Sequence, residues 1–254
     1  MNYLLRLSLF LAILLLPAYG IAAPAPDSGV VTIVIEPMFG DQPLQLSDKQ
    51  YVDNFGDTLY IDLFRFYMTD LDFGSKADTT FVLAGYSHLV DAEDKNTRSF
   101  SVKIPAGTYS SFNFTAGVDS VDNTSGANGG DLDPAMGMYW AWNTGYIMAK
   151  LEGHSNVCKT LHHAFEFHIG GYMPPYNAAR NIDLSLGKEI TVGSATLNKI
   201  IIKADVSKWL TTASLAKVNS IVIPGKDAAA MADNYAKMYS LDGIRHFEYP
   251  VIKQ

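Results

Sequence analysis

The sequence predicts an all-β fold, an antiparallel β-sandwich with long loops and a short C-terminal helix. Apolar residues alternate with polar ones at the two-residue period of a strand, as in the segment 100–104. These runs are separated by clusters of Gly, Pro, Asn and Asp, which are the residues that turns prefer. Many short strands between such turns are typical of a sandwich or a barrel.

The expected strands cover residues 30–36, 59–68, 81–90, 100–104, 109–115, 164–169 and 200–206. In the second of them, Leu59, Ile61 and Leu63 should share one face, and Phe64 should lie on the other. Residues 228–239 are rich in good helix formers, and Asp227 is expected to cap that helix.

The N-terminus predicts export. Arg6 precedes ten almost entirely apolar residues, and small residues follow, so residues 1–22 are expected to form a signal peptide cleaved between positions 20 and 23. The rest of the chain lacks an apolar run long enough for a membrane span, and residues 30–254 are expected to form a single domain. The mature protein is therefore expected in the periplasm, outside the cell or on its surface.

The composition restricts the class of partner and the source of stability. The chain has 19 Lys and Arg against 26 Asp and Glu, a net charge of −7, which disfavours nucleic acid and suits a cation. Cys158 is the single cysteine in the sequence, so an intramolecular disulfide is excluded.

Two histidines stand on expected strands. His88 follows Tyr86 by two positions, so both side chains should project from one face. His168 follows Phe165 and Phe167, and it should point with Glu166 away from the face that these rings bury. Two neutral imidazoles with an aromatic neighbour would suit copper or zinc. The alternative is that each is an ordinary hydrogen-bonded histidine.

Two further groups carry metal-ligand side chains. His154, Cys158 and His162 are spaced by four, but the segment reads as a loop and matches no standard zinc pattern. A second group could supply oxygen ligands for calcium, although Asp, Asn and Gly are also ordinary turn residues. Its carboxylates are Asp119, Asp122, Asp131 and Asp133.

The segment 129–146 combines glycines, carboxylates and aromatic residues without a regular hydrophobic period, which predicts a loop. Trp140 and Trp142 lie in it and would either pack the loop on the sandwich or face a partner. The sequence contains no Gly-x-Ser-x-Gly, phosphate-binding or His-Glu-x-x-His motif, and we expect a protein without catalytic activity.

Taken together, these motifs resemble the MbnP-like copper-binding proteins, a family of exported bacterial proteins related to those of methanobactin operons and to methanotroph surface copper proteins. The similarity covers nearly the whole mature chain. It is carried by the segments 63–69, 86–91, 117–120 with Asn123, 132–134, 137–147, 150–153, 167–171 and 232–235.

The resemblance implies a copper site with His88 and His168 as ligands. It also implies a dihaem peroxidase-like partner that oxidises a tryptophan to kynurenine in some members. The position expected for that tryptophan holds Tyr86, so Tyr86 would be an aromatic neighbour of the metal. Glu166 and Asp91 would orient the imidazoles from outside the ligand set. Trp140 and Trp142 remain as side chains that such a partner could oxidise or contact.

Two alternatives stay open. The aromatic loop 138–146 could be a protein-recognition surface on which Tyr139, Tyr146 and the two tryptophans meet a partner, with copper incidental. The protein could also be a metallohydrolase, which requires at least three protein ligands that converge on one ion.

Overall fold

The computed structural model describes residues 27–76, 80–143, 145–212 and 214–248. The expected signal peptide, residues 1–22, lies outside the described residues. Within the described ranges, no helix is both long and apolar enough to cross a membrane.

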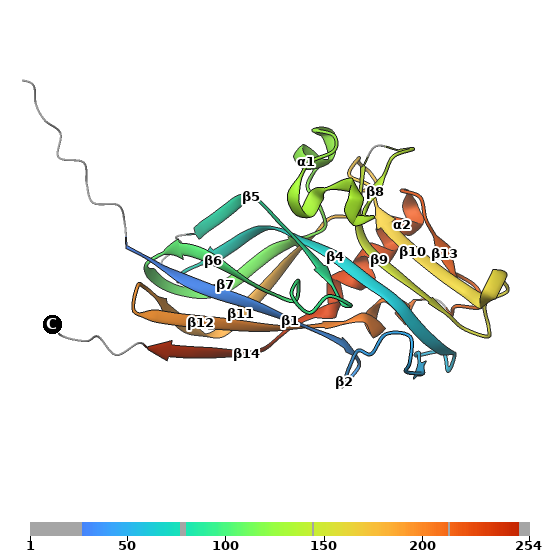
Figure 1. The fold of residues 1–254 in the computed structure, drawn as a ribbon, viewed down its shortest axis with the longest axis horizontal. Helices are drawn as coiled ribbons and strands as arrows, with labels where there is room; N and C mark the ends of the chain where they lie inside the picture. The colour runs from blue at the N-terminus through green and yellow to red at the C-terminus, as the bar shows by residue number, and fades with distance from the viewer. Residues whose placement is uncertain (1–26, 77–79, 144, 213, 249–254) are drawn as a thin grey trace, which may run out of the picture.

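The chain folds into strands with short helical turns between them (Figure 1). The strands are β1 (Ser28–Phe39), β2 (Gln42–Pro43), β3 (Tyr51–Val52), β4 (Thr58–Gly74), β5 (Thr80–Asp91), β6 (Ser99–Pro105), β7 (Gly107–Ala116), β8 (Tyr139–Trp140), β9 (Gly145–His154), β10 (Ala164–Gly170), β11 (Arg180–Val192), β12 (Thr196–Asp205), β13 (Ser220–Ile221) and β14 (Tyr239–Glu248). The helices are α1 (Ser120–Thr124) and α2 (Lys226–Tyr235), and the 3-10 turns are η1 (Gly130–Leu132), η2 (Pro134–Met136), η3 (Leu161–His163), η4 (Val206–Thr211) and η5 (Ala236–Met238).

The strands form two sheets that pack face to face, so the expected sandwich is confirmed. One sheet has the order β14-β12-β1-β2, and β6 also pairs with β1. The other has the order β11-β7-β4-β9-β10-β13, and β3, β5 and β8 pair with its members. Most pairs are antiparallel as expected, but β1 pairs with β12, and β10 with β13, in parallel.

The core lies between the sheets. On β1, Val31, Ile33 and Ile35 alternate with more exposed residues and are almost completely buried. They belong to one hydrophobic cluster with Phe64 and Phe66 of β4, so both sheets contribute to the same core. Burial of this apolar surface is the main term that favours the folded chain.

Strand β4 organises the larger sheet because it is paired along both edges. Residues 65–74 pair with β5, while residues 60–66 pair with β9 and residues 68–74 with β7. A register shift in the β4–β9 ladder between Ile61 and Leu63 changes which residues face the core. Phe64 is therefore fully buried in the core, as are Leu59 and Ile61, whereas Leu63 is only partly buried. The expected assignment of side chains to the two faces of this strand was therefore wrong for Leu63 and Phe64, which follow the register shift.

Every expected strand is present, and three long strands are additional. Strand β9 begins with five consecutive buried residues, so it shows no alternation at its start. Strand β11 does alternate, but the expected set omits it, and β14 is largely exposed beyond its first residue. The expected helix is confirmed as α2, although Gly225 and not Asp227 occupies its N-cap position.

The long segment between β7 and β9 lies on the outer face of the larger sheet, where α1 and the turns before β8 stand above β4 in Figure 1. Tyr67 of β4 donates a hydrogen bond to the carbonyl of Asp131, and Tyr146 of β9 donates one to the carbonyl of Leu132, each at 2.9 Å. Both rings belong to a second, smaller hydrophobic cluster that also contains Leu132 and Met138. The sheet thus fixes the position of this loop.

Gly153 tests the contact between β4 and β9. A Cβ at this position would lie 2.1 Å from the carbonyl oxygen of Tyr60 and 2.5 Å from Cζ of Phe165. Because a backbone oxygen cannot move without breaking the ladder, Gly153→Ala should lower the free energy of unfolding by about 2–3 kcal/mol in urea denaturation.

Gly129→Ala is the matched control, because its φ is −102° and no atom lies within 4 Å of the added Cβ. It should change the stability by less than about 0.5 kcal/mol. Equal stability of the two variants would contradict this account of the ladder.

Candidate functional site

His88 lies between the sheets at the edge strand β5, and both of its ring nitrogens face oxygen atoms. Nδ1 is 3.0 Å from Oδ2 of Asp131, and Nε2 is 2.7 Å from the carbonyl oxygen of Thr97. A carboxylate and a carbonyl only accept hydrogen bonds, so both contacts are satisfied when the ring donates from both nitrogens. The ring also packs against Phe100 of the other sheet, with the centroids 4.0 Å apart.

Asp131 reaches His88 because η1 is held against the edge of the sheet. Its Oδ2 also accepts a hydrogen bond from the backbone N–H of Leu89 at 3.0 Å. The side chain of His88 is 13% exposed and that of Asp131 is 40% exposed. The imidazole is therefore shielded, while its carboxylate partner is open to solvent.

Tyr86 lies beside this pair, as the sequence predicts. Its ring stacks on Phe100 with the centroids 5.9 Å apart. Burial, together with the negative charge of Asp131, raises the pKa of Tyr86 to about 12. Its phenol therefore stays protonated at neutral pH in the metal-free protein.

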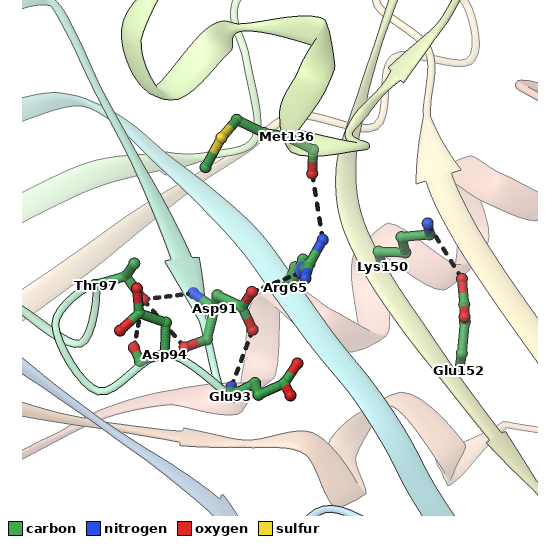
Figure 2. A network of polar contacts seen from close by, with 8 residues as sticks. All are labelled: Arg65, Asp91, Glu93, Asp94, Thr97, Met136, Lys150 and Glu152. Carbon is green, nitrogen blue, oxygen red and sulfur yellow. Dashed lines mark hydrogen bonds and ion pairs between the residues drawn. The ribbon is translucent and has the colours of Figure 1, made fainter.

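His168 lies on β10 and points away from the core with Glu166, as expected. Its Nε2 is 2.7 Å from Oε1 of Glu152, and the same oxygen is 3.2 Å from Nζ of Lys150 (Figure 2 shows the latter pair). The hydrogen bond from His168, aided by the charge of Lys150, lowers the pKa of Glu152 to about 2 against the opposing effect of burial. In the neutral ring, donation by Nε2 leaves Nδ1 with a lone pair.

The structure does not bring His88 and His168 together. His88 is paired with Met68, a core residue, so the side chain of His88 projects from the inner face of the sheet. His168 is paired with Lys150, which is paired with Arg65, and these three share the outer face. The two histidines stand on opposite faces and are separated by three strand spacings, about 14 Å. A single site with both side chains as ligands is not formed in this arrangement.

Neither of the two carboxylates expected to orient the imidazoles takes that position. Asp91 forms an ion pair with Nε of Arg65 at 2.7 Å, and Nη1 of Arg65 donates to the carbonyl of Met136 (Figure 2). Glu166 is exposed, and the carboxylate that contacts His168 is Glu152. Strand periodicity could not identify Glu152, since β9 was not among the expected strands.

The carboxylates expected to form a calcium loop serve mainly as turn residues. Asp119 caps α1 by accepting from the N–H of Asp122, and Asp133 caps η2 by accepting from Ala135. Burial and the charge of Asp119 raise the pKa of Asp122. Throughout the described ranges, no group of three or more His, Cys, Asp or Glu side chains is arranged to hold a metal ion.

The group spaced by four residues is dispersed. Nδ1 of His154 is 2.9 Å from Asp62, and the imidazole stacks on Tyr60. Cys158 is buried, and burial raises the pKa of its thiol, whereas His162 is exposed.

The aromatic loop is packed more tightly than a partner-facing surface would require. Tyr146 is fully buried and Trp140 is 6% exposed, whereas Trp142 is 64% exposed. The rings of the two tryptophans lie 5.9 Å apart. Of the tryptophans predicted either to pack the loop or to face a partner, Trp140 does the first and Trp142 is free for the second.

The low pKa of Glu152 predicts a pH-dependent contribution to stability. Its carboxylate titrates near 4.5 when unperturbed and near 2 in the folded protein, so the stabilisation is complete above about pH 4.5 and is lost as the pH falls towards 2. Glu152→Gln should therefore lower the free energy of unfolding at pH 7 by about 1–2 kcal/mol, a value reduced by solvent screening. The difference from the unaltered protein should shrink between pH 4.5 and pH 2 in chemical denaturation.

Glu166→Gln is the control, because Glu166 is paired with Glu152 across the ladder but is exposed. It should cost no stability at pH 7. A loss that is the same at every pH in Glu152→Gln would count against the ion pair.

The match to a protein-family model agrees with the resemblance carried by the sequence motifs. The model of the MbnP family matches residues 28–224 of this chain. Among solved structures, MbnP from Methylosinus trichosporium aligns with a TM-score of 0.48 and 11% identity, over 80% of this chain and 83% of that one. No curated protein matches. Because the family match spans well over half of its length, the chain belongs to the MbnP family.

Proposed function

We propose that this protein is an exported copper-binding protein that carries or scavenges the ion and has no catalytic turnover. Membership of the MbnP family and the signal-like N-terminus support this proposal. The observation that carries it is the contact between Nδ1 of His88 and Oδ2 of Asp131, at 3.0 Å.

The His88–Asp131 pair offers a nitrogen and an oxygen donor on two different segments. A metal ion can take the place of the proton that lies between an imidazole nitrogen and a carboxylate, because both are then ligands to the same cation. The exposed side of Asp131 gives such an ion access from solvent. Two protein donors leave the remaining coordination positions to water or to a ligand delivered with the ion.

His168 is the weaker candidate despite its free Nδ1. The ammonium of Lys150 lies 3.2 Å from the carboxylate that faces this ring, so positive charge already neutralises Glu152. A second cation beside Lys150 would be repelled. We therefore propose a site centred on His88, in place of one shared by both histidines.

The donor types favour copper(II). Imidazole and carboxylate suit tetragonal copper(II), whereas copper(I) prefers soft sulfur ligands, which this pair does not offer. Tyr86 is proposed as an aromatic neighbour of the site, where its ring stacks on Phe100. Calcium is not proposed, because Asp119 and Asp133 are engaged as helix caps. A metallohydrolase is not proposed either, since it needs three converging ligands.

Trp142 supports a second candidate function, recognition of a protein partner. Its side chain is 64% exposed and is backed by the buried Trp140. Exposed aromatic residues are enriched at protein interfaces. The dihaem peroxidase-like protein implied by the family would meet the chain here, and Trp142→Ala should then weaken its binding at least tenfold while copper binding stays unchanged.

Copper titration of single variants tests the primary proposal. The protein should bind one copper(II) ion, and His88→Ala or Asp131→Asn should weaken binding at least tenfold in a competition titration. The first variant removes the nitrogen ligand, and the second replaces an anionic oxygen ligand by a neutral and weaker one. The side-chain amide oxygen that Asp131→Asn introduces would still accept the hydrogen bond from Leu89, which keeps the loop in place.

His168→Ala and Tyr86→Phe are the controls, and each should leave the affinity within about twofold. Thermal unfolding of all four variants would show that they remain folded. Loss of binding in His168→Ala alone would move the site to the outer face, and no binding in the unaltered protein would refute the proposed function.

A further inference from the structure

The described residues form a pocket of about 270 Å³ whose lining includes neither His88 nor Asp131. It lies where β8, the start of β9 and the segment after β10 meet the N-terminus of α2, elements that are grouped together in Figure 1. Trp140, Tyr172 and Tyr176 contribute to its walls from different segments, with the buried Tyr146 beneath.

Glycine residues allow these walls to approach one another. Gly171 has a φ of +117°, and a Cβ there would lie 3.0 Å from Cβ of Pro224 and 3.2 Å from the carbonyl oxygen of Tyr176. At Gly145 the fit is looser, because a Cβ there would make only ordinary contacts, 3.4 Å from Oδ1 of Asn123 and 3.6 Å from Cε1 of Tyr172. The pocket is thus bounded by backbone and aromatic rings and is open to solvent on one side, where Met173 and Tyr176 are exposed.

None of the residues that line this pocket carries a charge. The side chain of Asn123 is already occupied, since it donates to the carbonyls of Val118 and Asp119 and accepts from the N–H of Tyr146. Burying a charged ligand without a partner would be costly. Asn143 at the pocket is the remaining side-chain amide.

The wider electrostatics disfavour ions of either sign. The N-terminal end of α2, at Gly225, carries partial positive charge, so it would repel a cation bound in the pocket. For an anion, the lining supplies no basic side chain, Asp227 in the first turn of that helix offsets the helix charge, and the chain as a whole has a net charge of −7. The lining and its surroundings therefore select a neutral ligand.

The size of the pocket and its aromatic walls restrict the class of ligand further. A cavity of about 150 Å³ lined by apolar side chains accepts benzene, so about 270 Å³ has room for two fused rings. Aromatic ligands gain from offset or edge contacts with Trp and Tyr rings beyond the burial of area alone. We propose that this pocket binds a neutral, planar two-ring aromatic compound of about the size of indole, independently of copper.

Isothermal titration with indole tests the proposal on the full protein. Indole should bind with a Kd of about 1 mM or tighter. Tryptamine, indole-3-carboxylate and cyclohexanol should each bind at least tenfold more weakly, because they add a positive charge, add a negative charge or lack the aromatic face.

Tyr176→Ala should weaken indole binding at least fivefold, since this ring is 44% exposed at the pocket. Phe55→Ala is the matched control, with a ring 47% exposed outside the pocket lining, and it should have no effect. Indole should also shift the side-chain N–H resonance of Trp140 but not that of Trp209, which is buried in the core.

Three outcomes would overturn the proposal. They are no binding of indole at about 5 mM, equal binding of the charged analogues, and binding that leaves the Trp140 resonance unmoved. The last readout does not depend on any variant folding. Because copper is absent from the experiment, a failure here leaves the proposed copper site untouched.

Discussion

The double-sided pairing of β4 is the constraint on which the rest of the structure depends. This strand is hydrogen-bonded to β5 along one edge and to β9 and then β7 along the other. Pairing along both edges fixes which side chains lie on each face of the strand, because a register shift of one residue moves every following side chain to the opposite face. The irregularity between Ile61 and Leu63 uses this property to bury Phe64 and to turn Arg65 outwards. The same registers place His88 and His168 on different faces.

The outer face of that sheet is equally important for the candidate site. Tyr67 and Tyr146 are buried phenols whose hydroxyl groups donate to the backbone of η1, so the loop is positioned by hydrogen bonds as well as by apolar contact. Burial together with the nearby phenol and carboxylate raises the pKa of Tyr67, which keeps its proton available for this bond. These contacts hold Asp131 next to His88, although the two residues are far apart in the sequence.

The sequence alone predicted those features that depend on a single strand, namely where the strand lies and which way its side chains point. Dense β-branched residues located β1, alternation located β6, and the position of His168 opposite the core followed from Phe165 and Phe167. The sequence did not predict features that depend on how two strands, or a strand and a loop, are placed relative to each other. β9 begins with buried residues on both faces, so its period is hidden, and with it Glu152 as the partner of His168. The contact of His88 with Asp131 depends on how a loop docks, and the separation of the two histidines depends on ladder register. Neither can be derived from spacing along the chain.

Cys158 has a practical consequence. Its side chain is 1% exposed, its Sγ lies 3.8 Å from the carbonyl of Leu215, and burial raises the pKa of its thiol, so little thiolate is available for reaction. It is also the single cysteine of the sequence. A substitution such as Trp142→Cys would thus create one reactive thiol on an otherwise unreactive molecule. A spin label or fluorophore attached there would report on the aromatic loop alone, and reductants would leave the fold without a disulfide to break.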